Sequence, residues 1–416
     1  MGKVGVARGA PTHGPIVLRK SRVTASIGRL KVSGRKNGAC MTRSSIPRSE
    51  PGQDQPNLYG EVGLLELQQR QAAAVHLPAA IASTSAPTSA SSGGSPGHTD
   101  SASSRERQRR LWFAAAKPPM YAVGIVPILV GAGAAYYSTG AFLSGIFWKL
   151  MAGAVLIIAW LNLSNDAYDA QTGVDENKEE SVVNLTGGNR SGVLALANAC
   201  LLAGAWLLHA GTKAAGDVHV GAALALAIGM GYMYQGPPFR LSYKGLGEPL
   251  CFLAFGPLAT CAFFLAQAGA ASAVGYASVT AAAAAASVIV GATTTSVLFC
   301  SHFHQIDGDT AAGKMSPLVR LGPSRGYQVL RAGVLLTYLL LDVAAALSWL
   351  PLTCLFAQIL SVPSAMALVD FGKRTHEEPE LVRPLKRYAL KWHMALGASL
   401  AAGLTIAGLP ATTFLL

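Results

Sequence analysis

The sequence predicts an all-α integral membrane protein with about nine transmembrane helices around a central cavity. Of its 416 residues, 51% are hydrophobic and 13% are charged, and the mean hydropathy is +0.37. This composition is unusual for soluble domains and is expected when the solvent is a lipid bilayer. Apolar stretches close to the ~20 residues that cross a bilayer recur from Met120 almost to the C-terminus.

The positions of the apolar stretches and of the basic residues together set the expected topology. Nine spans are expected, at residues 120–137, 142–163, 192–211, 218–234, 249–268, 277–300, 327–347, 350–371 and 392–412. Basic residues cluster before the first span and after the second, fourth, sixth and eighth, whereas the other loops contribute Lys213 alone. By the positive-inside bias, the N-terminal side and these charged loops share one compartment.

Residues 1–104 are expected to be a transit peptide and a disordered linker, followed by the membrane domain at 105–416. Residues 1–49 contain eleven basic residues and no acid, which accounts for most of the net charge of +12. This segment has no compact apolar core, so an organelle transit peptide is expected, with a disordered cytosolic tail as the alternative. Residues 83–104 are too polar to fold alone. Because the excess of positive charge lies in this leader and the rest of the chain is nearly neutral, no nucleic-acid partner is expected.

The six cysteines show no C-x-x-C pairing, and most of them lie in or beside apolar spans. We expect them to be small buried hydrophobic residues, with neither a disulfide framework nor a zinc site.

The second expected span ends in an acidic cluster that points to cation binding. Four polar side chains share one helix face there, within an arc of about 100°: Asn162, Asn165, Asp166 and Asp169. Two carboxylates so close repel each other, so they need a divalent ion or a basic partner between them. An isolated D-x-x-D also occurs in solvated acidic loops, but the apolar run before this one favours a site at the membrane boundary.

A second polar cluster follows the sixth span, on the same side of the membrane. In a continuous helix His302 and Asp309 share a face, and Asp307 joins them only if Gly308 unwinds the chain. His302 and His304 do not share a helix face, so we expect them to form hydrogen bonds or packing contacts rather than a transition-metal site.

Basic residues lie close to both acidic clusters. Lys314 and Arg320 follow the second cluster directly, and the companion loops contribute Lys178, Arg190, Arg240 and Lys244. Acids and bases on one membrane face suit a di-anion bridged through Mg²⁺, because phosphate and carboxylate oxygens are the ligands this ion prefers. The topology bias alone also accounts for Lys178 and Arg190.

The loop between the fourth and fifth spans is rich in glycine and proline, which indicates a fixed shape. Tyr234 and Tyr243 in this region can present their ring faces to a cation, although tyrosine is also common at membrane boundaries. Glu248 at the start of the fifth span is accounted for by helix capping.

Two acidic clusters across nine spans resemble the UbiA-type intramembrane aromatic prenyltransferases, from Lys117 to the C-terminus. Three motifs most resemble the 1,4-dihydroxy-2-naphthoate branch: Asn165-Asp166-x-x-Asp169-x-x-x-Gly173-Val174-Asp175, Tyr-Lys-Gly-Leu-Gly-Glu-Pro at 243–249, and Gly313-Lys314 with Val319-Arg320-Leu321-Gly322. The segment 302–309, joined to a transit-like leader, is similar to the plastid branch that attaches phytyl for phylloquinone (vitamin K1).

Two positions depart from the pattern of that superfamily. Gly173 stands where many relatives have the last acid of the first motif, so Asp175 must substitute for it. Gln305 stands where bacterial relatives have an acid, which leaves Asp309, with Asp307 as the less secure replacement.

The resemblance implies a prenyl diphosphate and an aromatic acceptor as substrates, Mg²⁺ as cofactor, and a multi-pass location in a chloroplast membrane, either thylakoid or inner envelope. It assigns the Mg²⁺ ligands to Asp166, Asp169 and Asp309, supported by Asp175 and Asp307. The leaving pyrophosphate is stabilised by Lys178, Lys244, Lys314 and Arg320. The allylic cation is shielded by Tyr234 and Tyr243, with Asn162 or Asn165 positioning groups nearby. The acceptor ring then attacks this cation, and in the naphthoate branch the carboxylate leaves as carbon dioxide.

Other functions stay open at this point. Homogentisate prenyltransferase and chlorophyll synthase share the diphosphate chemistry and differ in the acceptor. A transporter is the alternative from another class, because intramembrane acids also mark ion pathways. A non-catalytic membrane scaffold is the remaining alternative.

Overall fold

The computed structural model describes residues 99–172 and 181–410, and within these ranges it contains helices and no strands. The predicted transit peptide and linker lie almost entirely outside the described residues. Gly173, Asp175 and Lys178 also lie outside them.

The long helices follow the order of the expected spans: α3 (Ala122–Thr139), α4 (Ser144–Thr172), α6 (Arg190–Thr212), α7 (Val218–Gln235), α8 (Gly247–Leu253) continuing through a π-helical turn (Ala254–Thr260) into α9 (Cys261–Ala271), α10 (Ala281–His302), α12 (Pro317–Ala346), α13 (Leu355–Thr375) and α15 (Leu385–Ala407). Shorter helices connect them or precede them: α2 (Thr99–Ala116), α5 (Val182–Leu185), α11 (Ile306–Ala311) and α14 (Pro379–Val382).

Seven helical segments of the described chain are long and apolar enough to cross a membrane. The segments that contain α7 and α15 are not among the seven, so the expected count of nine spans is not confirmed. Both helices carry polar residues at one end: Tyr234 and Gln235 close α7, and Lys386 and Arg387 open α15.

Helix boundaries differ from the expected ones where capping residues decide them. The α10 helix begins at Ala281 because the Thr280 hydroxyl accepts a hydrogen bond from the Ala283 amide. The α12 helix begins ten residues before the expected span, at Pro317, with Ser316 as its N-cap and a kink at Gly322.

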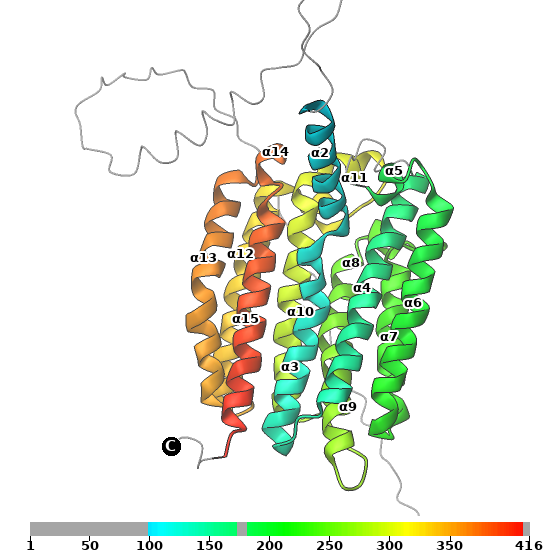
Figure 1. Cartoon of the computed structure of the whole chain (residues 1–416). Coiled ribbons are helices and arrows are strands. Elements are labelled where there is room, and N and C mark those ends of the chain that lie inside the picture. Colours follow the sequence, from blue (N-terminus) through cyan, green and yellow to red (C-terminus); the bar gives the residue numbers. More distant parts are fainter. Residues whose placement is uncertain (1–98, 173–180, 411–416) are drawn as a thin grey trace, which may run out of the picture. The chain divides into compact units, whose positions relative to one another are not determined.

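The α3 helix lies in the middle of the unit, between α15 on one side and α4 on the other (Figure 1). Glycines allow its backbone to approach its neighbours closely. A Cβ atom on Gly131 would lie 2.9 Å from the Phe264 amide of α9, and one on Gly133 would lie 2.8 Å from the Ala401 carbonyl of α15. Small residues at helix contacts are the usual means of tight packing in membranes.

The charged connections gather at one end of this unit. Figure 1 shows α5, α11 and α14 at the same end as α2, whereas the loop after α9 lies at the other end. This agrees with the expectation that the acidic clusters after α4 and α10 share one membrane face. We call this the charged end.

Gly133→Ala tests the close contact between α3 and α15. The added methyl group meets a backbone carbonyl rather than a flexible side chain, so we expect a loss of about 1–3 kcal/mol and a lower midpoint of thermal unfolding in detergent. Gly229→Ala in α7 is the matched control, because its Cβ would meet no atom within 4 Å. An equal midpoint for both variants would contradict the packing role of Gly133.

Candidate active site

Asp166, at the C-terminal end of α4, is buried and fully engaged by two other segments. Its Oδ1 atom lies 2.7 Å from Lys117 Nζ, and its Oδ2 atom accepts a hydrogen bond of 3.1 Å from the Val182 amide. Lys117 has left-handed backbone angles (φ 48°, ψ 48°), which cost a non-glycine residue about 1 kcal/mol. The ion pair fixes the turn between α2 and α3 to the end of α4.

Asp169 lies one turn further along α4 and accepts a hydrogen bond from an amide. The Gln235 Nε2 group donates to Asp169 Oδ1, and Gln235 Oε1 accepts a 3.0 Å hydrogen bond from Ser242 Oγ. Gln235 is the last residue of α7, and Ser242 belongs to the following loop. Asp169 therefore connects α4 to the glycine-rich and proline-rich loop that precedes α8.

Asn162 and Asn165 stand on the same helix as the two acids, and both are half-buried. The Asn162 Nδ2 atom is buried without a hydrogen-bond partner. Buried amide donors are nearly always satisfied, so this group is available to a bound molecule.

Asp309 brings the second acidic cluster to the same end of the unit. It is 2% exposed, and its Oδ1 atom lies 3.2 Å from Lys314 Nζ. The turn is closed by a 2.7 Å hydrogen bond from the Lys314 amide to the Asp309 carbonyl, and Gly313 in this turn has a φ of 71°. The second carboxylate oxygen of Asp309, Oδ2, is buried and has no hydrogen-bond partner.

Asp307 does not join Asp309. Gly308 keeps the α11 helix intact instead of unwinding it, so the condition for bringing Asp307 to the same face is not met. Asp307 is exposed, whereas Asp309 is buried.

The loop before α8 is attached to the turn that follows Asp309. The Met315 amide donates to the Tyr243 carbonyl at 2.9 Å, and Arg320 Nη2 donates to the Lys244 carbonyl at 2.9 Å. The Arg320 and Lys244 side chains are both exposed at this end. Arg320 thus holds the two loops together, in addition to the stabilisation of pyrophosphate that the sequence resemblance assigns to it.

The two tyrosines differ in their surroundings. Tyr234 packs its ring against Gly247, where a Cβ atom would lie 2.8 Å from Tyr234 Cε2. It lies within electrostatic range of Asp169, Asp309 and Glu248. Tyr243 is half-buried, and the Arg240 guanidinium lies over its ring at 6.0 Å from the centroid. Tyr234 is therefore the residue that both acidic clusters share.

The carboxylates are suited to a divalent cation but do not form a complete protein cage for one. In residues 99–172 and 181–410 there is no group of three or more His, Cys, Asp or Glu side chains placed to hold a metal. Mg²⁺ commonly takes one or two carboxylates and completes its shell with water and substrate phosphates. The open Asp309 oxygen fits that mode of binding, and Asp169 is within electrostatic range of the same Tyr234 side chain.

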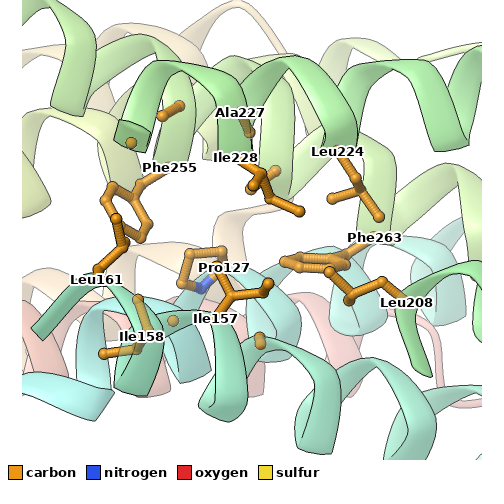
Figure 2. A pocket seen from close by; sticks show the side chains of 15 residues that line it. Pro127, Ile157, Ile158, Leu161, Leu208, Leu224, Ala227, Ile228, Phe255 and Phe263 are labelled. Carbon is orange, nitrogen blue, oxygen red and sulfur yellow. The ribbon is translucent and has the colours of Figure 1, made fainter. Parts of the chain in front are cut away.

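An apolar cavity of about 70 Å³ lies next to the acidic end of α4. Figure 2 shows Leu161 and Phe255 at one end of it and Leu208, Leu224 and Phe263 at the other. Leu161 precedes Asp166 by five residues, about one and a half helical turns. The cavity therefore lies in the membrane part of the unit, with its Leu161 wall towards the acids.

The wall of this cavity includes the π-helical turn Ala254–Thr260, whose Ala254, Phe255 and Ala259 face it. Pro257 lies inside this turn and cannot donate a backbone hydrogen bond. Such π-bulges widen a helix locally and are frequent at functional sites.

A comparison with protein families matches residues 124–395 to the UbiA prenyltransferase family. The chain belongs to this family. It is 46% identical over 301 residues to the chloroplastic 2-carboxy-1,4-naphthoquinone phytyltransferase of Arabidopsis thaliana, covering 72% of this chain and 78% of that protein. It is 44% identical over 301 residues to the 2-carboxy-1,4-naphthoquinone phytyltransferase of a Synechocystis species, covering 72% of this chain and 95% of that protein.

The fold has a solved counterpart. The apo structure of a UbiA homologue from Aeropyrum pernix superposes with a TM-score of 0.53 at 15% identity, covering 71% of this chain and 99% of that one. Membership of a prenyltransferase family decides against the transporter and the scaffold.

The sequence-based expectation omitted two residues that shape this site, Lys117 and Gln235. In the sequence, Lys117 is one of several basic residues before the first span, and no motif or spacing indicates a role for Gln235. His302 was expected to form a hydrogen bond, and its Nδ1 atom lies 3.0 Å from Glu248 Oε1, a partner 54 positions away. The α8 helix has Leu246 as its N-cap, so Glu248 is not its capping residue.

Proposed function

We propose that this protein transfers a phytyl group from phytyl diphosphate to 1,4-dihydroxy-2-naphthoate, with loss of the carboxylate, in phylloquinone biosynthesis. The observation that carries the proposal is the 46% and 44% identity to two phytyltransferases named for a carboxylated naphthoquinone. The dihydroxy form is the acceptor because the reaction needs an electron-rich ring, whereas a quinone ring is electron-poor.

The diphosphate headgroup binds at the charged end, between the acids of α4 and Asp309. Asp169 and Asp309 would hold Mg²⁺ there together with the substrate phosphates, and Asp166, bound to Lys117 and the Val182 amide, would fix the end of α4 beside them. The ion would neutralise charge on the leaving pyrophosphate. Lys314 and Lys244 stabilise the same group, and Arg320 keeps their loops in place. Asp175 and Lys178 lie in the segment outside the described residues, and we assign them supporting roles.

The phytyl chain occupies the apolar cavity beside Leu161, Ile158 and Leu224, which removes its carbon atoms from water. The allylic cation then forms at the mouth of the cavity, beside the half-buried Tyr234 ring. The aromatic face stabilises positive charge, and the apolar walls keep water from capturing the cation. Asn162, with its unpartnered buried amide, positions the reacting groups, and we assign supporting roles to Tyr243 and Asn165.

The protein is placed in a chloroplast membrane. The Arabidopsis relative is chloroplastic, and seven helical segments of the described chain are long and apolar enough to cross a bilayer. The basic, acid-free residues 1–49 fit a transit peptide.

A donor and acceptor panel tests the proposed activity. Membranes that contain the protein are offered phytyl, geranylgeranyl or solanesyl diphosphate together with dihydroxynaphthoate, its oxidised quinone, or homogentisate. We expect the highest kcat/KM for phytyl diphosphate with dihydroxynaphthoate under reducing conditions, with release of carbon dioxide. Preferential transfer to homogentisate would contradict the proposed acceptor, and no transfer to any acceptor would contradict the proposed reaction.

The different positions of the two acids in α11 give a matched test of the Mg²⁺ site. Asp309→Asn removes a buried carboxylate with one open oxygen, so we expect kcat/KM to fall by at least about 10²-fold and the Mg²⁺ requirement to rise. Asp307→Asn changes an exposed carboxylate that faces away and should stay within about threefold of wild type. Asp166→Ala and Asp169→Ala should abolish Mg²⁺-dependent transfer with membrane insertion intact, as should removal of Mg²⁺ by a chelator. Equal losses in Asp307→Asn and Asp309→Asn would refute the assignment.

A further inference from the structure

Glu248 and His302 form a buried pair that the proposed chemistry of the diphosphate does not use. Glu248 lies in the first turn of α8 and is 8% exposed, and His302 ends α10 and is 2% exposed. His302 Nδ1 lies 3.0 Å from Glu248 Oε1. Among the described residues, no lysine or arginine forms an ion pair with Glu248, so this carboxylate is not neutralised as Asp166 and Asp309 are.

The other carboxylate oxygen of Glu248 is directed to no protein group. Glu248 Oε2 is buried and has no hydrogen-bond partner. Burying a carboxylate oxygen without a partner is costly, and such atoms in folded proteins call for a ligand that satisfies them. Glu248 Oε2 is therefore a hydrogen-bond acceptor that a donor on a bound molecule could satisfy.

The pair lies close to Tyr234, beside which the proposed function places the allylic cation. Gly247, next to Glu248 in the chain, touches the Tyr234 ring, and Tyr234 is within electrostatic range of Glu248, Asp169 and Asp309. Phe255, which lines the cavity, follows Glu248 by seven residues, so the two lie on nearly the same helix face. A molecule between Tyr234 and the cavity mouth would be within reach of Glu248.

We propose that Glu248 is the base that receives the hydroxyl proton of the aromatic acceptor, and that His302 positions it. This inference rests on the proposed function, because it takes the acceptor to be a dihydroxynaphthoate. Asp309 already pairs with Lys314 and Asp169 with Gln235, and the proposed function assigns both to Mg²⁺, so neither is available for the same task.

The proposed reaction is balanced in protons and electrons without another reactant. The phytyl C–O bond breaks, and its electron pair leaves with pyrophosphate. The ring carbon that carries the carboxylate forms the new C–C bond, the adjacent hydroxyl becomes a carbonyl, and its proton moves to Glu248. The resulting β-keto carboxylate loses carbon dioxide, its C–C electron pair restores the aromatic ring, and Glu248 returns the proton to the oxygen.

His302 keeps Glu248 in place for this transfer. A carboxylate oxygen only accepts hydrogen bonds, so His302 Nδ1 donates to Oε1 while Glu248 is ionised. That hydrogen bond leaves Oε2 as the oxygen that faces the acceptor. The other titratable groups within electrostatic range of Glu248 are Tyr234 on α7 and Cys251 one turn along α8, and Tyr234 is in turn within range of Asp169 and Asp309.

The test compares Glu248→Gln with wild type in the full-length protein reconstituted with lipid. Glutamine keeps the size and the hydrogen bond but accepts no proton. We expect kcat to fall by about 10²-fold, the usual contribution of general acid–base catalysis, with the KM for phytyl diphosphate unchanged. Without this base, only acceptor that has already lost its hydroxyl proton in solution can react. The rate of the variant should therefore rise about tenfold per pH unit up to the pKa of the acceptor hydroxyl.

Matched variants separate catalysis from structure. Glu380→Gln, an exposed residue of α14, should leave kcat and the pH profile as in wild type. His302→Asn keeps a donor near the Nδ1 position and should retain most activity, whereas His302→Leu should lose it. If Glu248→Gln fails to fold, wild type is measured with an acceptor methylated on the hydroxyl beside the carboxylate, and an unchanged rate would overturn the proposal.

The outcomes distinguish this proposal from the proposed function. If wild type transfers phytyl to dihydroxynaphthoate and Glu248→Gln has an unchanged kcat and pH profile, the role of Glu248 is wrong and the function stands. Loss of phytyl diphosphate binding in Glu248→Gln would also overturn the role, because it would place Glu248 at the headgroup. If wild type uses another hydroxylated acceptor, the function is wrong, and the same comparison with that acceptor still tests Glu248.

Discussion

The arrangement of the charged end depends on the cost of holding carboxylates at the boundary of an apolar helix bundle. Buried ionised groups require a charged or hydrogen-bonding partner. The structure provides a different partner from a different segment for each one: Lys117 for Asp166, Gln235 for Asp169, and Lys314 for Asp309. Satisfying Asp166 and Asp169 therefore also joins α4 to the turn after α2 and to the end of α7, and Lys314 closes the turn that holds Asp309.

This constraint also explains how one site serves a charged headgroup and a hydrocarbon tail. The polar partners end where α4 reaches Leu161, and the apolar cavity begins there. Tyr234 stands at that boundary, in contact with the start of α8 and within range of both acidic clusters. A cation formed at this point is electrostatically favoured on one side and kept from water on the other. The buried Glu248 and His302 pair extends the boundary towards the aromatic acceptor.

Much of this could be predicted from the sequence because the relevant signals are local. Apolar length gave the helices, the alternation of basic loops placed both acidic clusters at one end, and the helical period placed Asp166 and Asp169 on one face. The same period predicted that Asp307 and Asp309 separate in a continuous helix, as they do. The family motifs are likewise short and continuous.

The partners of these residues could not be predicted, because packing between distant segments selects them. Lys117 and Asp166 are 49 positions apart, Gln235 and Asp169 are 66 apart, and Glu248 and His302 are 54 apart. No local pattern indicates which of many basic or amide residues meets a given acid. The π-helical turn beside the cavity was missed for the same reason, since one proline in an apolar run fits a kinked helix equally well.

The most direct measurement is a structure of the protein with Mg²⁺ and a thio-linked phytyl diphosphate that cannot ionise. The account predicts one headgroup bound to both α4 and Asp309 through Mg²⁺, with the chain following Leu161, Ile158 and Leu224 into the cavity and the first phytyl carbon beside Tyr234. A headgroup that contacts only one of the two acidic clusters, or a chain that leaves the cavity empty, would contradict it.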